Sequence, residues 1–579
     1  MFSAYKSIKK LLFILDKKLI IFLPLLSLFF ISGILDLISL GMIAPYINFV
    51  IDPDIINNNK FSKFIPFKIT EENKSDFFIY FSFSLILIFF LKALFSILIR
   101  ALINRFALKN LENLQVRLIS AYQNMNYSDF IKRNTTEYIR NVRELSAQCT
   151  LCLDLGLRIA SELIVLIVIV FFLLTIKPVP LIILVIIILL SLLLYNFYLK
   201  PKTVEYGKKK IEASKLVYQG VLESIKGFKE IKLLEKQNFF RNIVKKGAGE
   251  IFRNEFKNSI IVNSPRYFLE FIIIMFVIGF LLINTISGNQ DMNILPTIGI
   301  FAVAALRILP GASIIINGLL MISHYQSGID LVYKDIDKFS KIKIDDKNLN
   351  KIEYEEDFNE IKLENISFKY PISDKFIFKN LNFTLKNNDC IGIIGETGSG
   401  KTTLIDILLG LLKPTEGKIM LNNKELNLNK LPWSKKIAYL PQDHLILDGT
   451  IIKNITLLED SEKIDDYKIT KSIKQANLEK LIKDLPNGVN TTIGGKGIRL
   501  SGGQYKKICL ARLFYHEKDI LIMDEATNSL DKRSEELIVD EIARLKGKKT
   551  IVVITHNLST LKYCDQIYKI ENMTILKNS

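Results

Sequence analysis

Long apolar runs fill the first half of this chain and limit what it can fold into. A helix that crosses a lipid bilayer needs roughly 20 mainly apolar residues, because every backbone group must find its hydrogen-bond partner inside the segment. We identify six such candidate spans: Leu19–Val50, Phe77–Ile103, Ser161–Thr175, Leu181–Leu199, Phe268–Ile286 and Ile294–Ser323. Because the third run is short, we expect its helix to begin near Leu151. The first run is too long for a cleaved signal peptide and is expected to be retained as a span.

The positive charge of the chain is distributed as in a membrane protein. The net charge is +18, and basic residues cluster at the ends of apolar runs, as at Lys9, Lys10, Lys17 and Lys18. This is the pattern of the positive-inside rule. Because no basic stripe with interleaved aromatic residues appears, we expect no nucleic-acid partner. An even number of spans predicts a multi-pass protein of the cytoplasmic (inner) membrane with both termini in the cytoplasm.

The connections between the expected spans differ in character. Asn104–Arg143 and Lys200–Asn258 are long and amphipathic, and predict helices that project into the cytoplasm. The polar stretch Asp52–Asp76 is an outer loop in which phenylalanines recur at three-residue spacing (Phe61, Phe64 and Phe67). This loop is either a short amphipathic helix at the lipid surface or a solvated loop. Cys149 and Cys152 form a lone CxxC on a helical stretch, which favours apolar packing over metal binding.

The pattern of apolar and polar residues changes after a charged linker. We place an all-α transmembrane domain at residues 1–335, the linker at 336–360 and a second domain at 361–579. In the second domain short β-like runs alternate with helices, which predicts an α/β phosphate-binding fold. The expected strands are Ile361–Tyr370, Phe376–Leu385, Cys390–Ile394, Ile437–Leu440, Ile520–Met523 and Thr550–Thr555.

A glycine-rich segment directly follows the run Cys390–Ile394 and opens a helix at Thr403. It reads Gly395, Glu396, Thr397, Gly398, Ser399, Gly400, Lys401 and Thr402. Glycines at this spacing allow backbone N–H groups to converge on phosphate oxygens at a helix N-terminus. Lys401 would neutralise the β- and γ-phosphates, and the Thr402 hydroxyl would bind Mg²⁺. The segment therefore predicts an ATP site that uses Mg²⁺.

An apolar strand ending in two acids, Asp524 and Glu525, predicts the other half of this site. The strand would bring Asp524 to the metal, and Glu525 would orient or deprotonate the attacking water. Such a run is a weak signal alone, but it is a strong one downstream of a phosphate loop. We therefore predict ATP hydrolysis with Glu525 as the general base.

A second segment that opens a helix, Leu500–Gln504, is also rich in backbone donors. One monomer has no further phosphate for it to hold, so we infer that it completes the ATP site of another copy. With these three motifs the chain resembles the ATP-binding-cassette transporters from Ile361 to its end. In that family two domains enclose two ATP molecules head to tail, so the resemblance implies a homodimer.

The resemblance also implies roles for individual residues. Tyr370 would stack on adenine, and Gln442 would sense Mg²⁺ and the transmembrane domain. Asp531 would belong to the loop at the dimer contact, and His556 would touch the γ-phosphate; a buried structural histidine is the alternative for His556. The signature residues that face the partner's nucleotide would be Ser501, Gly502, Gly503 and Gln504.

Three segments depart from the family pattern. Gln504-Tyr505-Lys506-Lys507 replaces the usual basic residues and second glutamine, and Gly494–Gly497 lacks a glutamate that exporters usually carry. Asn557 stands where an arginine usually follows the histidine. Because none of these changes removes a catalytic group, hydrolysis is still expected.

The first half resembles the exporter-type half-transporter and, more narrowly, bacterial flippases of protein N-glycosylation. Stretches at 30–45, 265–270 and 305–310 carry the narrower likeness. It implies ATP-driven flipping of a lipid-linked oligosaccharide, a polyprenyl-diphosphate glycan. A lipopolysaccharide-core or multidrug exporter and a non-transporting ATPase sensor are the alternatives.

Ionisable side chains inside the apolar runs fit an anionic substrate, because such groups usually face a cavity or a partner. They are Asp36, Lys92, Glu162, Arg266, Glu270 and Arg307. Spacing of four residues allows Arg266 to pair with Glu270, and Arg158 with Glu162. Lys92 and Arg307 have no such neighbour, so with Arg266 they are the candidate substrate ligands. Pairing with Asp36 from another helix, or snorkelling of Lys92, is the alternative.

Overall fold

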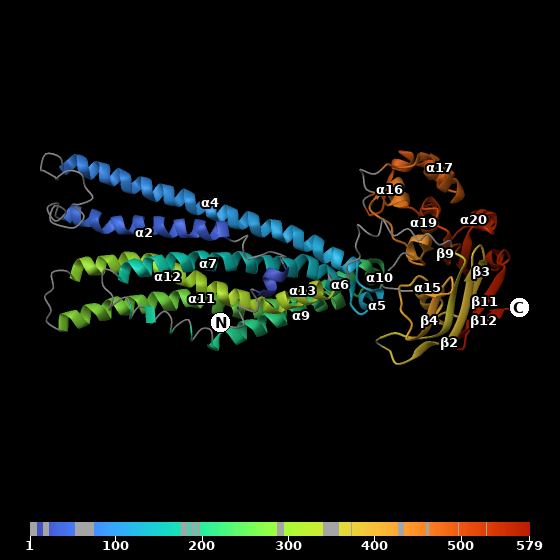
Figure 1. Ribbon diagram of the computed structural model, residues 1–579, viewed down its shortest axis with the longest axis horizontal. Coiled ribbons are helices and arrows are strands. Elements are labelled where there is room, and N and C mark those ends of the chain that lie inside the picture. Colours follow the sequence, from blue (N-terminus) through green and yellow to red (C-terminus); the bar gives the residue numbers. More distant parts are fainter. Residues whose placement is uncertain are drawn as a thin grey trace. The chain divides into compact units, whose positions relative to one another are not determined.

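The computed structural model describes the chain in two compact units (Figure 1). The described residues are 9–14, 23–51, 74–174, 197–286, 294–339, 358–371, 373–426, 433–458, 463–495, 497–528 and 530–578, with isolated residues between 182 and 193. The first unit holds Met1–Asn124 and Asn134–Ile342, and the second holds Met125–Arg133 and Lys343–Ser579. The second unit therefore takes nine residues that the sequence assigned to the transmembrane domain.

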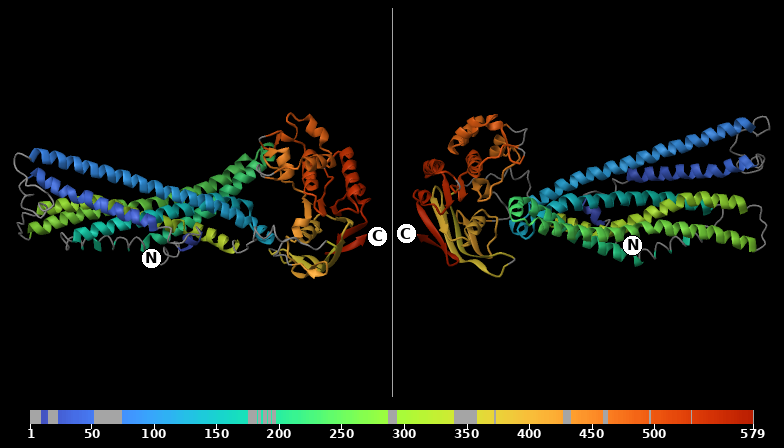
Figure 2. Two further views of the ribbon diagram at one scale, coloured as in Figure 1. Left: turned by 45° about the horizontal axis from the view of Figure 1, so that its top comes forward. Right: turned by 180° about the vertical axis from the view of Figure 1, so that it is seen from behind.

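Long helices build the first unit (Figures 1 and 2). They are α2 (Leu23–Ile51), α4 (Lys74–Gln123), α7 (Ser146–Leu174), α9 (Lys200–Lys226), α11 (Gln237–Ile286) and α12 (Ile294–His324). Shorter elements join them: α6 (Thr135–Arg140), the π-helical turn Asn141–Leu145, α10 (Phe228–Leu233) and α13 (Gln326–Phe339). Helix α4 runs unbroken for 50 residues because its sequence contains neither glycine nor proline.

Five of the six expected spans fall in these helices, and Leu181–Leu199 lies largely outside the described residues. Three described helical runs are long and apolar enough to cross a membrane, namely Ser75–Gln123, Thr135–Phe172 and Arg307–His324; Leu23–Ser39 is a shorter apolar run. Helix α7 begins at Ser146, earlier than Leu151. The outer-loop phenylalanines Phe61, Phe64 and Phe67 also lie outside the described residues.

The helices of the first unit pack around buried apolar side chains. Leu25 and Phe29 of α2 meet Ile99 of α4 and Leu157 of α7 in one cluster. Helix α9 crosses α12 so closely that a Cβ on Gly207 would lie 1.8 Å from the His324 carbonyl oxygen. Only glycine permits that approach.

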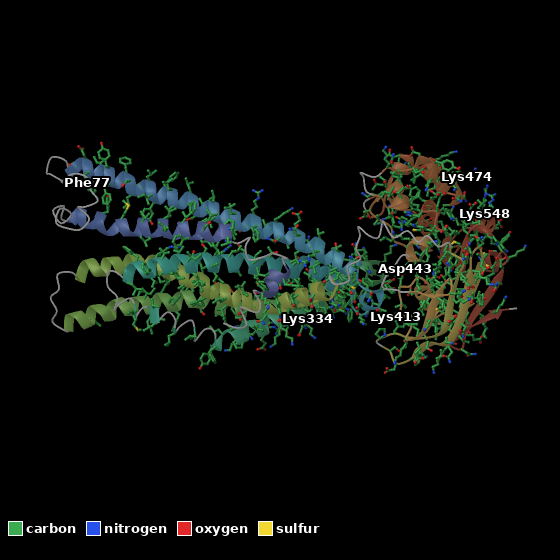
Figure 3. All side chains as sticks on the ribbon, viewed as in Figure 1. Phe77, Lys334, Lys413, Asp443, Lys474 and Lys548 are labelled. Atoms are coloured by element: carbon green, nitrogen blue, oxygen red, sulfur yellow. The ribbon has the colours of Figure 1, made fainter. Side chains whose placement is uncertain are left out.

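Buried polar contacts extend the first unit beyond its expected end. Helix α13 continues to Phe339, four residues into the expected linker. Asp335 is buried, and the Tyr122 hydroxyl donates to its Oδ2 at 2.7 Å. Figure 3 shows Phe77 near one end of this unit and Lys334 toward the other, where nitrogen- and oxygen-tipped side chains gather.

Cys149 and Cys152 are buried in an apolar cluster, which confirms their packing role.

Two larger sheets and a two-stranded sheet organise the described part of the second unit. The antiparallel sheet has the order β2-β1-β4-β5, with β1 (Glu360–Lys369), β2 (Phe376–Lys386), β4 (Glu416–Leu421) and β5 (Lys424–Glu425). The larger sheet has the order β12-β11-β3-β10-β9-β6. Its strands are β3 (Cys390–Gly395), β6 (Ile437–Leu440), β9 (Ile520–Asp524), β10 (Thr550–Ile554), β11 (Gln566–Glu571) and β12 (Thr574–Asn578). A two-stranded sheet pairs β7 (Gly449–Thr450) with β8 (Thr492–Ile493).

Helices accompany the strands of the second unit. They are α15 (Lys401–Leu408), α16 (Ile451–Thr456), α17 (Asp466–Gln475), α18 (Glu479–Asp484), α19 (Gly502–Tyr515), α20 (Lys532–Leu545) and α21 (Leu558–Leu561). Short α5 (Tyr127–Phe130) belongs here because Tyr127 and Ile131 pack against the apolar cluster that includes Phe378 and Leu404. The six strands expected from the sequence are confirmed as β1, β2, β3, β6, β9 and β10.

Candidate functional site

Four parallel strands bring the predicted ATP-site residues to one edge of the larger sheet. They lie in the order β3-β10-β9-β6, and each pair is in parallel register. The phosphate loop follows β3, His556 follows β10, Asp524 ends β9 with Glu525 directly after it, and Gln442 follows β6. The carboxyl ends of parallel strands are where open α/β sheets bind ligands.

The phosphate loop has the backbone that its glycines predict. Gly398 and Gly400 have φ of +83° and +103°, in the left-handed region that glycine adopts readily. A Cβ on Gly400 would also lie 2.7 Å from Ile377, so the loop has no room for a larger residue there. Lys401 folds back over the loop and donates to the carbonyl oxygens of Gly395 at 2.6 Å and Glu396 at 3.0 Å. The loop is thus a preformed turn that opens α15.

Polar groups of this loop fit a bound phosphate and Mg²⁺. The Ser399 hydroxyl is buried, and within the described residues it has no hydrogen-bond partner. Thr402, at the start of α15, is exposed, so its hydroxyl is free to meet a metal. Oxygen donors of this kind, with the Asp524 carboxylate, are those that Mg²⁺ prefers.

Asp524 and Glu525 differ in environment although they are adjacent. Asp524 is buried at the end of β9, and burial together with Glu525 raises the pKa of its carboxyl to about 6. Glu525 is partly exposed and has a left-handed φ of +52°. Gln442 Nε2 donates to Glu525 Oε2 at 3.0 Å. The structure thus brings together three residues that the sequence predicted for hydrolysis.

Tyr370 lies beside the same loop. Its hydroxyl forms a 2.9 Å hydrogen bond with the Thr403 Oγ1, and its ring packs edge-on against Phe368 at 5.1 Å. Thr403 is buried, so this contact fixes the end of β1 to the start of α15. Tyr370 therefore lies beside the start of α15, while its contact with a nucleotide and its stacking on adenine remain predictions.

The signature segment opens α19 through a capping box. Ser501 Oγ accepts from the Gln504 N–H at 3.3 Å, and the Ser501 N–H donates to Gln504 Oε1 at 2.8 Å. Ser501 and Gly502 are exposed, so the positive end of this 14-residue helix faces outward. An exposed helix N-terminus is suited to bind phosphate.

Asp531 caps the next helix rather than standing free. Its carboxylate accepts from the Ser534 N–H at 2.9 Å and from the Ser534 hydroxyl at 2.6 Å. These bonds hold the pKa of the Asp531 carboxyl below its ordinary value. The predicted dimer-contact residue thus fixes the start of α20.

His556 is exposed, so the buried structural histidine that was its alternative is wrong. The segment after it is fixed by Asn557, the residue that replaces the usual arginine. The Asn557 amide donates to Glu535 Oε1 on α20, and its N–H donates to Thr555 Oγ1 at 2.9 Å. Asn557 therefore anchors the histidine-bearing loop to α20.

Two residues of this edge were not predicted as site residues. Asn528 Nδ2 donates to Glu525 Oε2 at 2.9 Å, so two amides share one carboxylate oxygen. Lys506 of α19 is only 5% exposed and donates to the carbonyl oxygens of Glu525 and, at 2.8 Å, Asn528. The departure of Lys506 from the family pattern was the one signal in the sequence that pointed to it.

The charged residues of the first unit form a cluster in which two candidate substrate ligands, Lys92 and Arg307, are paired with acids. Arg307 donates to Asp36 Oδ2 from Nη2 at 3.0 Å and to Glu162 Oε2 from Nη1 at 3.0 Å. Lys92 Nζ lies 2.5 Å from Asp36 Oδ1. These four residues come from α12, α2, α7 and α4, and their formal charges cancel. Both Lys92 and Arg307 are therefore paired with Asp36, which was the alternative to an anion site.

The two pairs expected from spacing have different outcomes. Arg266 pairs with Glu270 at 3.0 Å, and its side chain is 65% exposed. Arg158 pairs with Asp154 at 2.9 Å rather than with Glu162. The expected Arg158–Glu162 pair is wrong because Glu162 faces Arg307 on α12.

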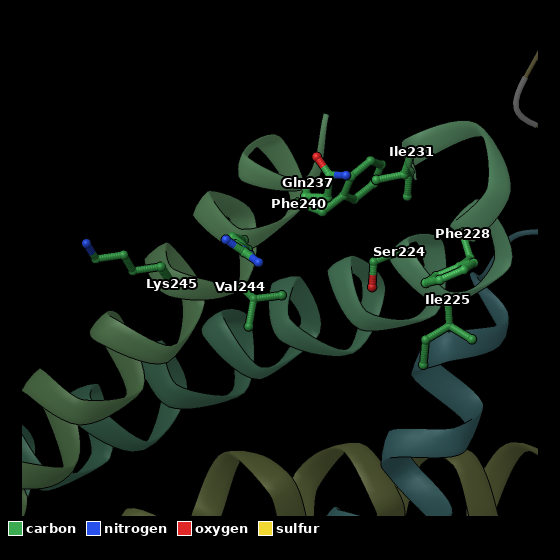
Figure 4. Close-up of a pocket in the computed structure, with 9 residues that line it drawn as sticks. Ser224, Ile225, Phe228, Ile231, Gln237, Phe240, Val244 and Lys245 are labelled. Carbon is green, nitrogen blue, oxygen red and sulfur yellow. The ribbon is translucent and has the colours of Figure 1, made fainter. Parts of the chain in front are cut away.

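A shallow groove of about 660 Å³ lies at the turn between α9 and α11. Apolar side chains line most of it, among them Ile225, Phe228, Ile231 and Phe240 (Figure 4). None of its lining residues was predicted for ATP or substrate binding.

Comparison with known proteins assigns the second unit. Residues 378–528 match the family model described as ABC transporter. An ATP-dependent lipid A-core flippase of Pseudoalteromonas translucida is 36% identical over 222 residues, which cover 38% of this chain and 38% of that protein. The ABC multidrug transporter mdr2 of Aspergillus fumigatus is 37% identical over 210 residues, or 36% of this chain and 26% of that protein. ABC transporter B family member 13 of Arabidopsis thaliana is 35% identical over 208 residues, or 36% of this chain and 16% of that protein.

The matched segments span well under half of each relative's length, so the likeness covers only part of each protein. The predicted ATPase domain is confirmed as an ATP-binding-cassette domain. The whole fold resembles a solved bacterial Atm1-family ABC exporter with ATP bound, with a TM-score of 0.75 and 17% identity over 97% of this chain and 96% of that one. The expected architecture, a helical exporter-type unit followed by an α/β nucleotide-binding unit, is confirmed.

Proposed function

We propose that two copies of this chain form an exporter that uses ATP hydrolysis to move a lipid across a membrane. The observation that carries this proposal is the edge where β3, β10, β9 and β6 end, which gathers the phosphate loop, His556, Asp524–Glu525 and Gln442. The same chain contains helices long and apolar enough to cross a membrane.

Each residue at this edge has a role in hydrolysis. The loop N–H groups and Lys401 hold the β- and γ-phosphates. Thr402, Asp524 and Gln442 would hold Mg²⁺, which neutralises phosphate charge when bound. Glu525 accepts a proton from the water that attacks the γ-phosphorus, and His556 donates to a γ-phosphate oxygen. Gln442 and Asn528 keep one carboxylate oxygen of Glu525 occupied, which leaves the other for the water.

The dimer follows from the signature helix. Ser501, Gly502, Gly503 and Gln504 open α19 with backbone N–H donors at a helix N-terminus where Ser501 and Gly502 are exposed. In a head-to-tail homodimer these donors would complete the partner's ATP site. The two ATP sites of such a dimer would together use the phosphate loop, the acidic pair and the signature segment of both chains.

For the substrate we propose a lipid-linked oligosaccharide, on the resemblance carried by residues 265–270 and 305–310. The match to a lipid A-core flippase supports a lipid as the transported molecule. Arg307, Lys92 and Arg266 are the residues proposed to meet the diphosphate, and this requires Arg307 and Lys92 to exchange the carboxylates of Asp36 and Glu162 for phosphate oxygens. Arginine suits that exchange because its planar fork can bind two oxygens at once.

A second candidate, an exporter of lipid A-core or amphipathic drugs, is favoured by the pairing of both cations. A charge-balanced cluster presents no net positive charge to an anion. The match to a multidrug transporter supports the same candidate.

Stimulated ATPase activity separates the two. The full chain in proteoliposomes would receive, in parallel, polyprenyl-diphosphate oligosaccharide, lipid A-core or a hydrophobic drug. We expect saturable stimulation by the polyprenyl-diphosphate lipid, lost in Arg307→Ala and retained with the matched surface change Lys334→Ala. Stimulation by lipid A-core or drug alone would support the second candidate, and a turnover rate that no cargo changes would favour an ATPase sensor.

A further inference from the structure

The buried ammonium group of Lys506 lies where the signature helix meets the turn that follows β9. Lys506 is the fifth residue of α19, and its side chain passes beneath residues 525–528. Its Nζ donates to the carbonyl oxygen of Glu525 and to that of Asn528, the latter at 2.8 Å. One side chain thus bonds both ends of this turn.

The turn needs such support. Glu525 has a left-handed φ of +52°, a conformation that a residue with a Cβ keeps only when its surroundings impose it. Two backbone bonds and one bond from a side chain define this conformation. The Glu525 N–H donates to the Ile554 carbonyl at 2.9 Å, the Asn528 N–H donates to the Glu525 carbonyl at 3.2 Å, and Lys506 bonds that same carbonyl.

Residues 525–528 also orient the side-chain carboxylate of Glu525. Asn528 Nδ2 donates to Glu525 Oε2 at 2.9 Å from the far end of the turn. Moving the backbone of Asn528 would therefore move the amide that holds the carboxylate. Lys506 acts on both ends of this short path through its bonds to the two carbonyl groups.

Burial makes Lys506 costly, so its position needs a reason. A cation only 5% exposed loses its hydration, and this burial lowers the pKa of Lys506. Two carbonyl bonds and the nearby carboxylates of Asp524 and Glu525 offset that loss. An apolar residue of similar length would fill the space without the cost.

We propose that Lys506 is a positioning residue that ties the signature helix to the turn carrying the general base. The proposal rests on the function proposed above. In a head-to-tail dimer the N-terminus of α19 binds the nucleotide of one site, while Lys506 holds Glu525 of the other. Binding at one site is thereby linked to the orientation of the base at the second.

The test compares Lys506→Met with Lys507→Met in the full-length dimer. Lys507 is the next residue of α19 and is half-buried. Lys506 and Lys507 differ in their bonds to residues 525–528. We expect Lys506→Met to lower the kcat of ATP hydrolysis by about 10- to 100-fold, the cost of a small misplacement of a reacting group. The KM for ATP should change less than about threefold. Lys506→Arg, which keeps charge and donors, should restore most of kcat, and Lys507→Met should match wild type.

Two further readouts separate positioning from folding. Nucleotide binding, measured with a fluorescent ATP analogue, should be unchanged in Lys506→Met. In the Glu525→Gln background, adding Lys506→Met should cause no further loss, because the group being positioned is gone. Equal losses in kcat and binding, or a further loss in that background, would overturn the proposal.

The outcomes also distinguish this inference from the proposed function. If Glu525→Gln hydrolyses ATP at the wild-type rate, the assignment of the base is wrong whatever Lys506 does. If Glu525→Gln is inactive while Lys506→Met keeps the wild-type kcat, only the positioning role of Lys506 is wrong.

Discussion

The side-chain amide of Gln442 donates a hydrogen bond of 3.0 Å to Oε2 of Glu525, although 83 residues separate the two in sequence. The contact exists because β6 and β9 are parallel neighbours, with Leu440 opposite Met523, so both strands deliver their next residues to one edge. The Asn528 side-chain amide donates to the same oxygen at 2.9 Å. Glu525 is thus held by two neutral donors, an arrangement suited to a base that must be ionised and aligned.

Replacing Glu525 by glutamine should abolish turnover and spare binding. The amide keeps the shape of the side chain but cannot accept the proton of the attacking water. Removing a general base typically costs about 10²- to 10⁴-fold in rate. Phosphate release and binding of a fluorescent ATP analogue would be measured on the same sample. Turnover within about threefold of wild type would assign the role to another group, such as His556.

Mixed dimers should show that Ser501 acts on the partner's nucleotide. A Lys401→Ala chain paired with a Ser501→Ala chain leaves one site with an intact phosphate loop and an intact signature. Both changes on one chain, opposite a wild-type partner, damage both sites. With two affinity tags to purify each mixed dimer, ATPase activity should be clearly higher in the first arrangement. Equal activity in the two arrangements would exclude the head-to-tail dimer.

Asp406→Asn should stabilise the second unit at neutral pH. Burial and Asp524 raise the pKa of the Asp406 carboxyl to about 6, against 3.8 for the ordinary group. The folded state therefore holds this proton more tightly than the unfolded state, and wild-type stability is lost as pH rises through about 6. The variant avoids that loss, so its free energy of unfolding at pH 7.5 should be higher by about 1–3 kcal/mol.

Fluorescence of Trp433 reports that unfolding directly. It is the one tryptophan of the chain, it is buried, and its Nε1 donates to the Leu408 carbonyl at 2.8 Å on the same helix as Asp406. The difference between variant and wild type should shrink to nothing as pH falls below about 4, where both unfolded and folded Asp406 are protonated. A difference that does not depend on pH would show that the charge of Asp406 is not the cause.

Asp36→Asn should weaken the helical unit far more than Glu270→Gln. Asp36 is 2% exposed and pairs with both Lys92 and Arg307, whereas Glu270 forms one exposed pair with Arg266. Removing one partner of a buried pair costs about 3–5 kcal/mol, and exposed pairs contribute about 0–1 kcal/mol. Thermal unfolding in detergent micelles should show a lower midpoint for Asp36→Asn only. Similar midpoints would mean that Lys92 and Arg307 find other partners.

The sequence predicted those parts of the fold that depend on local pattern. Strands β3, β9 and β10 are continuous apolar runs, and the glycines of the phosphate loop require their own backbone angles, so both could be located without a structure. The short β4 and β5, and the C-terminal β11 and β12, were not predicted. Their residues alternate in polarity or are exposed, and pairing between strands rather than local preference makes them strands.

The contacts that were missed join residues far apart in the chain. Spacing along one helix suggested Glu162 as the partner of Arg158, yet packing of α7 against α12 gives it to Arg307. The same limit applies to Lys506, whose acceptors are backbone carbonyls on another element. Because every residue carries a backbone carbonyl, the sequence does not indicate which one accepts a hydrogen bond from a buried lysine. Only the three-dimensional structure shows this.

Translocation of a labelled lipid in sealed vesicles would show whether this chain uses ATP to move a lipid. Proteoliposomes would carry fluorescent polyprenyl-diphosphate oligosaccharide in both leaflets, and a membrane-impermeant glycosidase would report how much substrate remains outside. With ATP added, the wild-type chain should shift the labelled lipid between leaflets, whereas Glu525→Gln with ATP, and wild type without ATP, should leave the distribution unchanged. Movement that proceeds equally in all three samples, or ATP turnover with no movement of this lipid or of lipid A-core, would show that the chain is not an ATP-driven lipid exporter.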